Sequence, residues 1–428
     1  MNFKIGKISI SLDVILALLF ASVIMSGLTV MCPYSVPRIW SFSAFGLLYI
    51  IFRKKFFALH SLLGQVYLVW LGFLCVNMAF SYSPKNTRDS LIIFASYLLL
   101  MAYEFKESGL MFLAKIIRVI SFVYAVSIFV SVVMPSLITG PLSSLMVQSP
   151  GVIADEHSRG IYSGIVGEKA QAAFYMNIGL LFEVGLMIKS KRFEIKNIIF
   201  VLIYFLALLL TGKRMLLLVS VCIVAFFFLC RGLNKKSTVI SLFVIAMAII
   251  PLGIVVLQVV PQAANVFERF SSMSGDDTYN GRTVFWDFCL YMFSCSPLIG
   301  FGFDSFNQAF GALTSFTFRG EDWNMYAHSI YYEMLGETGI IGVTIFFTII
   351  AVSFIKSWKY FKHYKLNDNQ KMFLFISMGI QIIFCLYGIT GNAIYDNNQL
   401  GFLMLSFILT LSVERWVKRE NIKRINAK

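Results

Sequence analysis

The chain has 428 residues, of which 58% are hydrophobic and 14% are charged, and its mean hydropathy is +0.78. A water-soluble protein needs far more charge to cover its surface, so this composition excludes a cytosolic enzyme, a secreted disulfide scaffold and a disordered protein. The formal net charge of +14 does not indicate nucleic-acid binding, because Lys and Arg accumulate in the cytoplasmic loops of membrane proteins.

Apolar stretches of about 20 residues recur from end to end, as is typical of bilayer-spanning helices. The sequence predicts about twelve such spans and therefore an all-α polytopic membrane protein. The spans are expected at residues 12–31, 37–52, 61–80, 90–103, 110–134, 170–188, 195–210, 215–230, 238–260, 329–355, 372–389 and 400–416. The first is too long for the apolar part of a signal peptide and is interpreted as an uncleaved anchor.

The basic residues support this layout. With the N-terminus in the cytoplasm, most of the 36 Lys and Arg residues fall on the cytoplasmic side, as the positive-inside rule expects. Both termini are then cytoplasmic. The remaining basic residues, which face outward, are Arg38, Lys85, Arg88, Arg159, Lys169, Lys213, Arg214, Arg269, Arg282 and Arg319. Guanidinium groups at the outer face of the bilayer indicate an anionic ligand.

The layout divides the chain into five segments. N-terminal helices occupy residues 1–134, an outer loop 135–168, central helices 169–260, a long outer loop 261–327, and C-terminal helices with a cytoplasmic tail 328–428. Long ordered loops are more often functional than idle. The second loop is expected to contain an amphipathic helix at Thr283–Ser294, ended by Pro297 and lying along the outer interface. Its apolar positions are Val284, Phe285, Phe288, Cys289 and Met292.

Several motifs follow one another along the outer face. Thr211-Gly-Lys-Arg214 begins an apolar span, and Arg159-Gly-Ile-Tyr-Ser-Gly164 precedes another. Further along come residues 280–286, Asn-Gly-Arg-Thr-Val-Phe-Trp, and residues 296–303, Ser-Pro-Leu-Ile-Gly-Phe-Gly-Phe. His328 then begins a span that continues into Leu335-Gly-Glu-Thr-Gly-Ile-Ile-Gly342. The order of these motifs, from about residue 155 to residue 345, resembles the signature of the O-antigen ligase and O-antigen polymerase superfamily.

The resemblance implies a GT-C-like membrane enzyme that transfers a glycan from undecaprenyl-diphosphate to a sugar hydroxyl, without a cofactor or a metal ion. Arg214, Arg282 and Arg159 are expected to bind the diphosphate, because fixed cations stabilise the charge that develops on a leaving group. His328 is the expected general base, since an unperturbed imidazole has a pKa of about 6.5. The family often has Asn after this His, whereas Ser329 stands here, so a hydrogen bond from that neighbour is not expected.

Several other polar residues have two interpretations, as ligand contacts or as structural residues. Arg319, Lys169 and Asp396 are candidate glycan contacts, while Asp396 also suits a turn. The alternative for Arg159 is pairing with the acidic residues before it, Asp155 and Glu156.

Buried polar and small residues in the spans are expected to be structural. Glu333 and Glu337 lie on one helix face and should accept hydrogen bonds from neighbouring helices. Gly336, Gly339 and Gly342 suit close helix packing. Glu183, inside a span, must be paired or face a cavity, and the sequence does not name its partner.

No metal site is predicted. The first outer loop, Cys32–Trp40, has no acidic residue, whereas proteins that resemble the metal-dependent lipid-linked glycosyltransferases carry acidic residues there. Asp276-Asp277 lies in a Ser/Gly-rich stretch that is typical of a solvated turn.

The favoured function is a polysaccharide polymerase of the bacterial cytoplasmic membrane, with its active site outside and a lipid-linked repeat unit as acceptor. The alternatives are a ligase that transfers the glycan to lipid A–core and a flippase for the same lipid-linked oligosaccharide. No repeat relates the two halves of the chain, which weighs against a transporter. A flippase and a chain-length regulator of the same pathway are the expected partners. The sequence leaves open whether the product is an O-antigen, a capsule or an exopolysaccharide.

Overall fold

The computed structural model describes residues 2–5, 8–25, 35–53, 57–146, 148–191, 194–231, 280–314 and 326–426. The predicted span at 238–260, Arg319 and the Asp276-Asp277 pair lie outside these residues. Within them, every other predicted span overlaps a helix. Seven helices are long and apolar enough to cross a membrane, and three shorter apolar helices accompany them in the same described part of the chain. The protein is therefore an all-α polytopic membrane protein.

The chain forms two compact units, each assembled from segments distant in sequence. The first unit comprises Met1–Ser35, Phe105–Ser274 and Tyr360–Leu386, and the second comprises Val36–Glu104, Gly275–Lys359 and Tyr387–Lys428.

The first unit contains a short antiparallel hairpin and a set of long helices. Its elements are β1 (Asn2–Ile5), β2 (Ile8–Ser11), α1 (Leu12–Ile24), α5 (Glu107–Val133), α6 (Pro135–Thr139), a 3₁₀ turn (Ser143–Leu145), α7 (Pro150–Ser158), a second 3₁₀ turn (Gly164–Val166), α8 (Lys169–Ser190), α9 (Ile195–Leu210), α10 (Arg214–Arg231) and α16 (Asp368–Tyr387, its last residue falling in the second unit). The hairpin and α7 were not predicted, since the first is short and the second lies in a segment without strong apolar periodicity.

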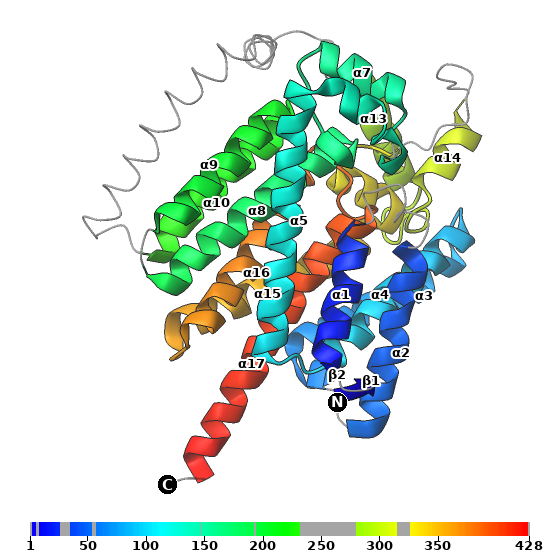
Figure 1. The fold of residues 1–428 in the computed structure, drawn as a ribbon. Helices are drawn as coiled ribbons and strands as arrows, with labels where there is room; N and C mark the ends of the chain where they lie inside the picture. Colours follow the sequence, from blue (N-terminus) through cyan, green and yellow to red (C-terminus); the bar gives the residue numbers. More distant parts are fainter. Residues whose placement is uncertain are drawn as a thin grey trace. The chain divides into compact units, whose positions relative to one another are not determined.

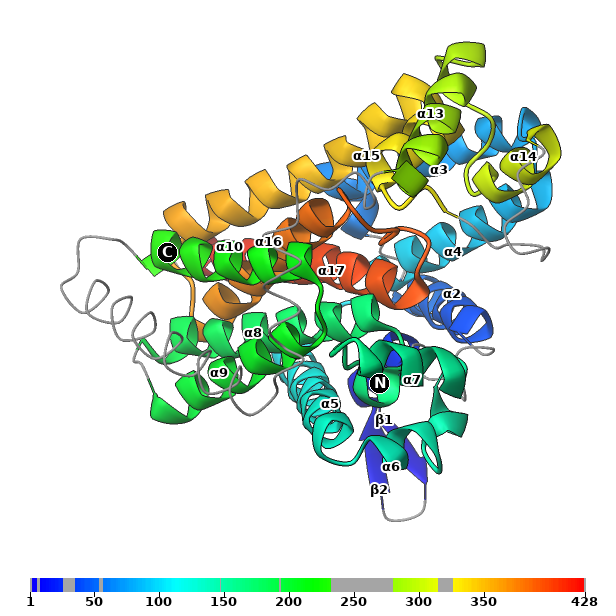
Figure 2. The ribbon, with the colours of Figure 1, turned by 90° about the horizontal axis from the view of Figure 1, so that it is seen from above.

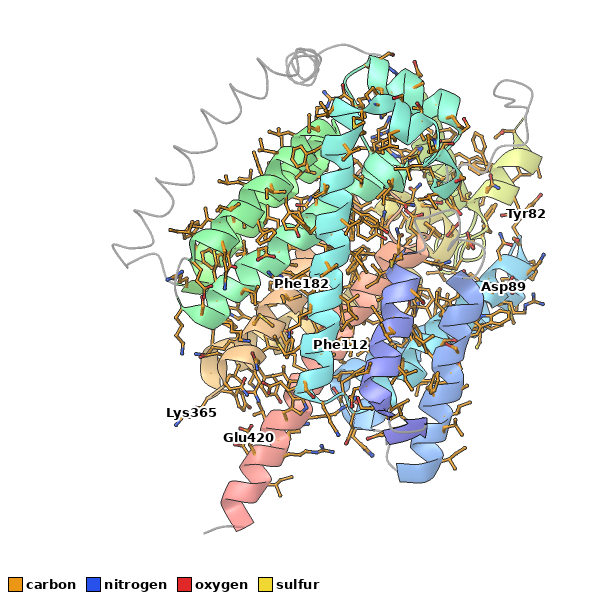
Figure 3. The ribbon with its side chains drawn as sticks, viewed as in Figure 1. Tyr82, Asp89, Phe112, Phe182, Lys365 and Glu420 are labelled. Carbon is orange, nitrogen blue, oxygen red and sulfur yellow. The ribbon has the colours of Figure 1, made fainter. Side chains whose placement is uncertain are left out.

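Helix α8 lies at the centre of the first unit and packs against α5, α9 and α10 (Figure 1). Gly179 permits the close approach of α9, because a Cβ atom there would lie 2.6 Å from the Tyr204 ring. Figure 3 shows the side chains of α5 and α8, including Phe112 and Phe182. The buried Glu183 of α8 accepts two hydrogen bonds from Arg118 of α5, at 2.8 and 3.1 Å. This ion pair supplies the partner that a carboxylate within a span requires.

The second unit contains the remaining helices. Its elements are α2 (Ser35–Arg53, its first residue falling in the first unit), a 3₁₀ turn (Phe57–His60), α3 (Leu62–Ala79), α4 (Pro84–Ala102), α13 (Asn280–Cys295), α14 (Phe306–Leu313), α15 (Ile330–His363, in this unit as far as Lys359) and α17 (Asn397–Asn426). Trp70 of α3 is fully buried and contacts the rings of Phe94, Phe303 and Phe346, which joins α3, α4, α15 and the loop before α14.

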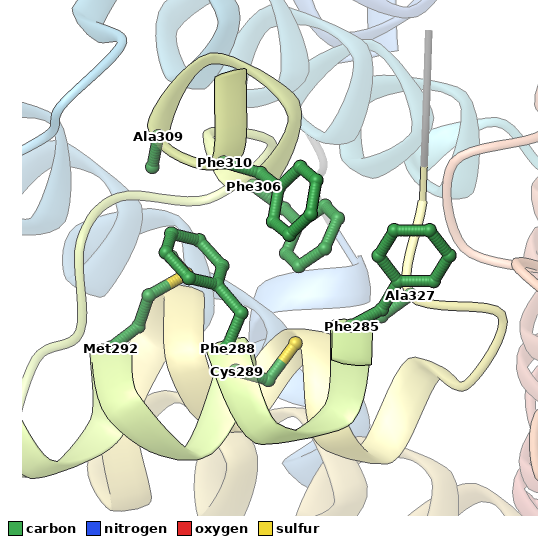
Figure 4. Close-up of a cluster of buried hydrophobic side chains, with 8 residues drawn as sticks. All are labelled: Phe285, Phe288, Cys289, Met292, Phe306, Ala309, Phe310 and Ala327. Carbon is green, nitrogen blue, oxygen red and sulfur yellow. The ribbon is translucent and has the colours of Figure 1, made fainter. Parts of the chain in front are cut away.

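Helix α13 is the helix predicted in the second outer loop, and it lies beside the start of α15 (Figure 2). It ends at Cys295, two residues before Pro297, as expected. Phe285, Phe288 and Met292 form a cluster with Phe306 and Phe310 of α14 (Figure 4). Val284 is 43% exposed and does not join this core.

Candidate functional site

The turn between α13 and α14 is joined to α15 by an exchange of backbone hydrogen bonds. Helix α15 is broken at Gly339, where φ is 59° and ψ is −170°. The carbonyls of Gly336 and Glu337 would accept from the amides of Ile340 and Ile341 in an unbroken helix. Instead they accept from the amides of Phe301 and Gly302, at 3.1 and 2.8 Å.

The released amides of Ile340 and Ile341 donate to the carbonyls of Pro297 and Leu298, at 2.9 and 3.2 Å. Only glycine suits this break, because a Cβ atom at Gly339 would lie 2.4 Å from the Leu298 carbonyl carbon. The prediction that Gly339 serves helix packing was therefore wrong. Gly336 does serve packing, since a Cβ atom there would lie 2.9 Å from the carbonyl oxygen of Cys289 on α13.

The buried carboxylate of Glu337 holds the same turn through its side chain. Its two oxygens accept from the amides of Asp304 and Phe306, both at 2.8 Å, and from the Tyr395 hydroxyl at 2.6 Å. Glu333 is also buried and accepts from the Ala327 amide at 3.0 Å. The prediction that both carboxylates accept hydrogen bonds is confirmed: the Phe306 amide belongs to the neighbouring helix α14, while the other donors come from loops.

Asn77 of α3 also holds this turn in place, a role that the sequence did not predict. Its Oδ1 accepts from the Phe303 amide at 2.7 Å, and its Nδ2 donates to the carbonyls of Ile299 and Glu337 at 2.7 and 3.2 Å. Asn77 lies more than 200 residues from its partners in sequence, so only the folded chain reveals the contact.

His328 is held on a short clamped segment that precedes α15. Its side chain is exposed, and its φ angle of 54° is left-handed, which is uncommon for a residue other than glycine. The preceding residue, Ala327, is fixed on both sides. Its carbonyl accepts from Trp286 Nε1 at 2.9 Å, and its amide donates to Glu333. Such a conformation persists only where the surroundings fix it, and it often marks a functional position.

Trp286 connects this segment to Arg282. The two residues are four apart on α13, so they lie on the same face, one helical turn from each other. The Trp286 ring also stacks on Tyr332 of α15, with centroids 5.0 Å apart and planes within 11°. The structure therefore places the α13 face that carries Arg282 next to the segment that carries His328.

The turn between α16 and α17 contributes a polar group to His328. Asn392 Nδ2 lies 3.5 Å from His328 Nδ1. Asn392 is thus the amide neighbour that Ser329 does not provide; Ser329 is buried, and its carbonyl accepts from the Glu333 amide. Asp396 belongs to the same turn and directly precedes α17, where its carbonyl accepts from the Leu400 amide at 2.8 Å. This backbone contact agrees with the turn-forming role.

Asp304 lies in the turn held by Glu337, with its backbone at φ 61°. Burial raises the pKa of this carboxyl to about 6, opposed by a hydrogen bond from Ser90 and reinforced by the negative charge of Asp89. Among the described residues, no group of three or more His, Cys, Asp or Glu side chains is arranged to hold a metal ion.

In the first unit, the motif at residues 159–164 contacts the motif at residues 211–214. The Tyr162 amide donates to the Leu210 carbonyl at 2.9 Å, and Gly212, at φ 66°, packs against Ile161. The segment 159–162 therefore contacts the segment immediately before Arg214, which begins α10 and is half-buried.

Two predicted ligand contacts of this unit have acidic partners. Arg159 pairs with Asp155, one helical turn before it, and Lys169 Nζ lies 2.7 Å from Glu156 Oε1. The alternative interpretation of Arg159 as an ion-pair residue thus has a direct contact in its favour. His157 is half-buried beside the Tyr162 ring, and burial lowers its pKa.

Comparison with known proteins agrees with the motifs. Residues 199–347 match the model of a family described as O-antigen ligase. The match includes Arg214, Arg282, His328 and Glu337, whereas Arg159, Lys169, Asn392 and Asp396 lie outside it. No curated protein matches the chain. Within residues 199–347 the chain is therefore similar to the O-antigen ligase family, which supports the resemblance to the superfamily of O-antigen ligases and polymerases.

Proposed function

We propose that the protein is a polysaccharide polymerase that transfers a growing glycan from undecaprenyl-diphosphate to a sugar hydroxyl of a lipid-linked repeat unit. The observation that carries this proposal is the clamped His328 segment, fastened through Trp286 to the α13 face that bears Arg282. The residue proposed as base and the residue proposed to bind the diphosphate thus lie on connected segments, which supports a transfer reaction with an anionic leaving group.

In the proposed reaction, His328 accepts the proton of the acceptor hydroxyl as its oxygen attacks the anomeric carbon of the donor sugar. The bond between that carbon and the diphosphate oxygen breaks, and the undecaprenyl-diphosphate leaves with the bonding electron pair. Arg282 and Arg214 bind the diphosphate oxygens, and their effect is largest in the transition state because negative charge grows there. Arg159 and Lys169 would join them only by exchanging their acidic partners.

Asn392 has a defined part in this scheme. An imidazole that takes a proton at Nε2 must carry its other proton at Nδ1, and an acceptor at Nδ1 fixes that tautomer. The two ends of an Asn amide have nearly the same shape. With Oδ1 turned toward Nδ1, Asn392 accepts this proton and stabilises the imidazolium that forms. Asn392 is therefore proposed as a positioning residue.

The setting of the reaction belongs to the same proposal. The protein resides in the bacterial cytoplasmic membrane with both termini in the cytoplasm and its site at the outer face, because this orientation satisfies the positive-inside rule. The product is an O-antigen, a capsule or an exopolysaccharide. A flippase that delivers the repeat units and a chain-length regulator are the expected partners, Arg319 and Asp396 are candidate glycan contacts, and no cofactor is required.

The surface glycan of a deletion strain, resolved on a gel, tests the assignment. Loss of a polymerase leaves a single repeat unit on the final acceptor. A fully polymerised glycan retained on its lipid carrier would instead identify the ligase, the second candidate, which is favoured by the similarity of residues 199–347 to the O-antigen ligase family. Accumulation of repeat units at the inner face would identify a flippase and overturn the proposal.

A further inference from the structure

The first unit contains a cavity of about 420 Å³ where α8 ends and α9 begins. Lys169 begins α8 and the cavity residue Ser190 ends it. The cavity therefore lies about 30 Å along this helix from Lys169, given the rise of an α-helix. None of the residues assigned to glycan transfer lines it. Its size is in the range of sites for small ligands.

Its walls combine cations with unused hydrogen-bond donors. Arg118 donates to Glu183 through Nε and Nη2, and within the described residues its Nη1 donates to no group. Lys189 also lines the cavity and has no ion-pair partner in the described part of the chain. Two cations that line one cavity and keep donors available are suited to a phosphate group.

The same cavity also contains carboxylates, which are suited to a cationic group. Glu194 and Asp368 line it, and each forms an ion pair with a lysine at 2.7 Å: Glu194 with Lys196, whose exposed side chain also lines the cavity, and Asp368 with Lys191 outside it. Exposed pairs of this kind contribute little and exchange readily. Asn197 also lines the cavity but is only 2% exposed, so its contribution to the walls is small.

We infer that this cavity binds a phosphoethanolamine headgroup, with the phosphate on Arg118 and Lys189 and the ammonium on the carboxylates of Glu194 and Asp368. A lipid is the favoured source, because three candidate membrane spans, α5, α8 and α16, supply cavity residues and two of them end there, at headgroup depth. The inference does not depend on glycan transfer.

Three phospholipids with the same acyl chains separate the contributions. Phosphatidylethanolamine has a phosphate and an ammonium with N–H donors, phosphatidylglycerol has a phosphate and hydroxyls but no cation, and phosphatidylcholine has a cation without N–H donors. Native mass spectrometry of the full-length protein in detergent measures how many molecules of each lipid remain bound. We expect phosphatidylethanolamine to be retained preferentially. Equal retention of all three, or preference for phosphatidylglycerol, would overturn the proposal.

Charge-specific variants sharpen the test. Glu194→Gln removes a partner of the ammonium, so the preference for phosphatidylethanolamine over phosphatidylglycerol should fall by about two- to fivefold. Lys189→Gln removes a partner of the phosphate and should lower the retention of both lipids. The matched control is Lys365→Gln, which removes an exposed lysine of the α15–α16 loop outside the cavity (Figure 3). An unchanged preference in Glu194→Gln would show that the ammonium does not bind there.

The source of the headgroup is tested by competition. Free phosphoethanolamine added in water should not displace the bound lipid at millimolar concentration, because the acyl chains contribute much of the affinity. Displacement at low micromolar concentration would assign the cavity to a water-soluble phosphoethanolamine compound and overturn the lipid as its source.

Discussion

The clamp around Ala327 predicts a specific loss of activity when Trp286 is replaced by Phe. The substitution removes the Nε1 donor that bonds the Ala327 carbonyl at 2.9 Å. It keeps an aromatic ring in place to stack on Tyr332. The fold should therefore persist while His328 loses one of the contacts that hold its left-handed backbone.

The expected size follows from two terms. A hydrogen bond of this kind contributes about 0.5–1.5 kcal/mol, and the left-handed conformation of a residue with a Cβ atom costs about 1–2 kcal/mol. Because the terms are similar, loss of the bond allows the segment to relax and depopulates the conformation that presents His328. About 1.4 kcal/mol corresponds to a tenfold change in rate, so we expect transfer to slow by about tenfold.

The assay is elongation of purified lipid-linked repeat units by the reconstituted protein, followed as product length against time. Trp40→Phe is the matched control, because Trp40 is 46% exposed on α2 and lies outside the site. The control should elongate at the wild-type rate. If Trp286→Phe also elongates at the wild-type rate, the clamp does not position His328 and the reasoning fails.

Three further predictions concern other groups of the second unit. Asn392→Ala should slow transfer by about tenfold by the same hydrogen-bond argument. Asn392→Asp should move the acidic limb of the pH–rate profile to higher pH, because a carboxylate stabilises the imidazolium. An unchanged rate and an unchanged profile in both variants would remove Asn392 from the mechanism. The folded-state pKa of Asp304, about 6, lies above its ordinary value of 3.8, so the folded state holds this proton more tightly and its stability falls as pH rises from about 4 to about 6. Asp304→Asn should raise the apparent Tm at pH 7.5 and leave it nearly unchanged at pH 4. The control Asp287→Asn, at an exposed position, should show no such pH dependence. An equal Tm shift of Asp304→Asn at both pH values would contradict the burial of Asp304. Gly339→Ala should destabilise the protein by more than about 2 kcal/mol, because of the φ of 59° at this position and the contact of the added Cβ atom with Leu298. The control Gly72→Ala should not destabilise it, because the added Cβ atom meets nothing within 4 Å. Thermal unfolding compares the two variants, and equal Tm values would refute the requirement for glycine.

The sequence could predict features that repeat along the chain or act over short distances. Hydropathy located the spans because a lipid-facing helix needs about 20 apolar residues. The spacing of Phe285, Phe288 and Met292 located α13, because these residues line one helix face that packs on α14. The acidic residues before Arg159 suggested the ion pair between Arg159 and Asp155 that the structure contains.

Contacts across long separations could not be predicted. Asn392 is 64 residues from His328, and Asn77 is 260 residues from Glu337; no periodicity relates such residues. The break at Gly339 was hidden because glycine at every third position is equally compatible with close packing of an intact helix. The Arg118 partner of Glu183 was obscured by its assignment as a cytoplasmic flanking charge, although it lies inside α5.

The central claim is that an imidazole at residue 328 removes the proton of the attacking sugar hydroxyl while arginines hold the diphosphate. Its most direct test is a single-turnover measurement with purified lipid-linked repeat units and reconstituted protein, comparing wild type with His328→Ala, Arg282→Ala and Arg282→Lys. A general base contributes about 10²–10⁴-fold, so His328→Ala should lose at least two orders of magnitude in rate. Arg282→Lys should recover only part of the rate lost in Arg282→Ala, because an ammonium lacks the two-pronged geometry of a guanidinium. A His328→Ala protein that transfers glycan within tenfold of the wild-type rate would contradict the account.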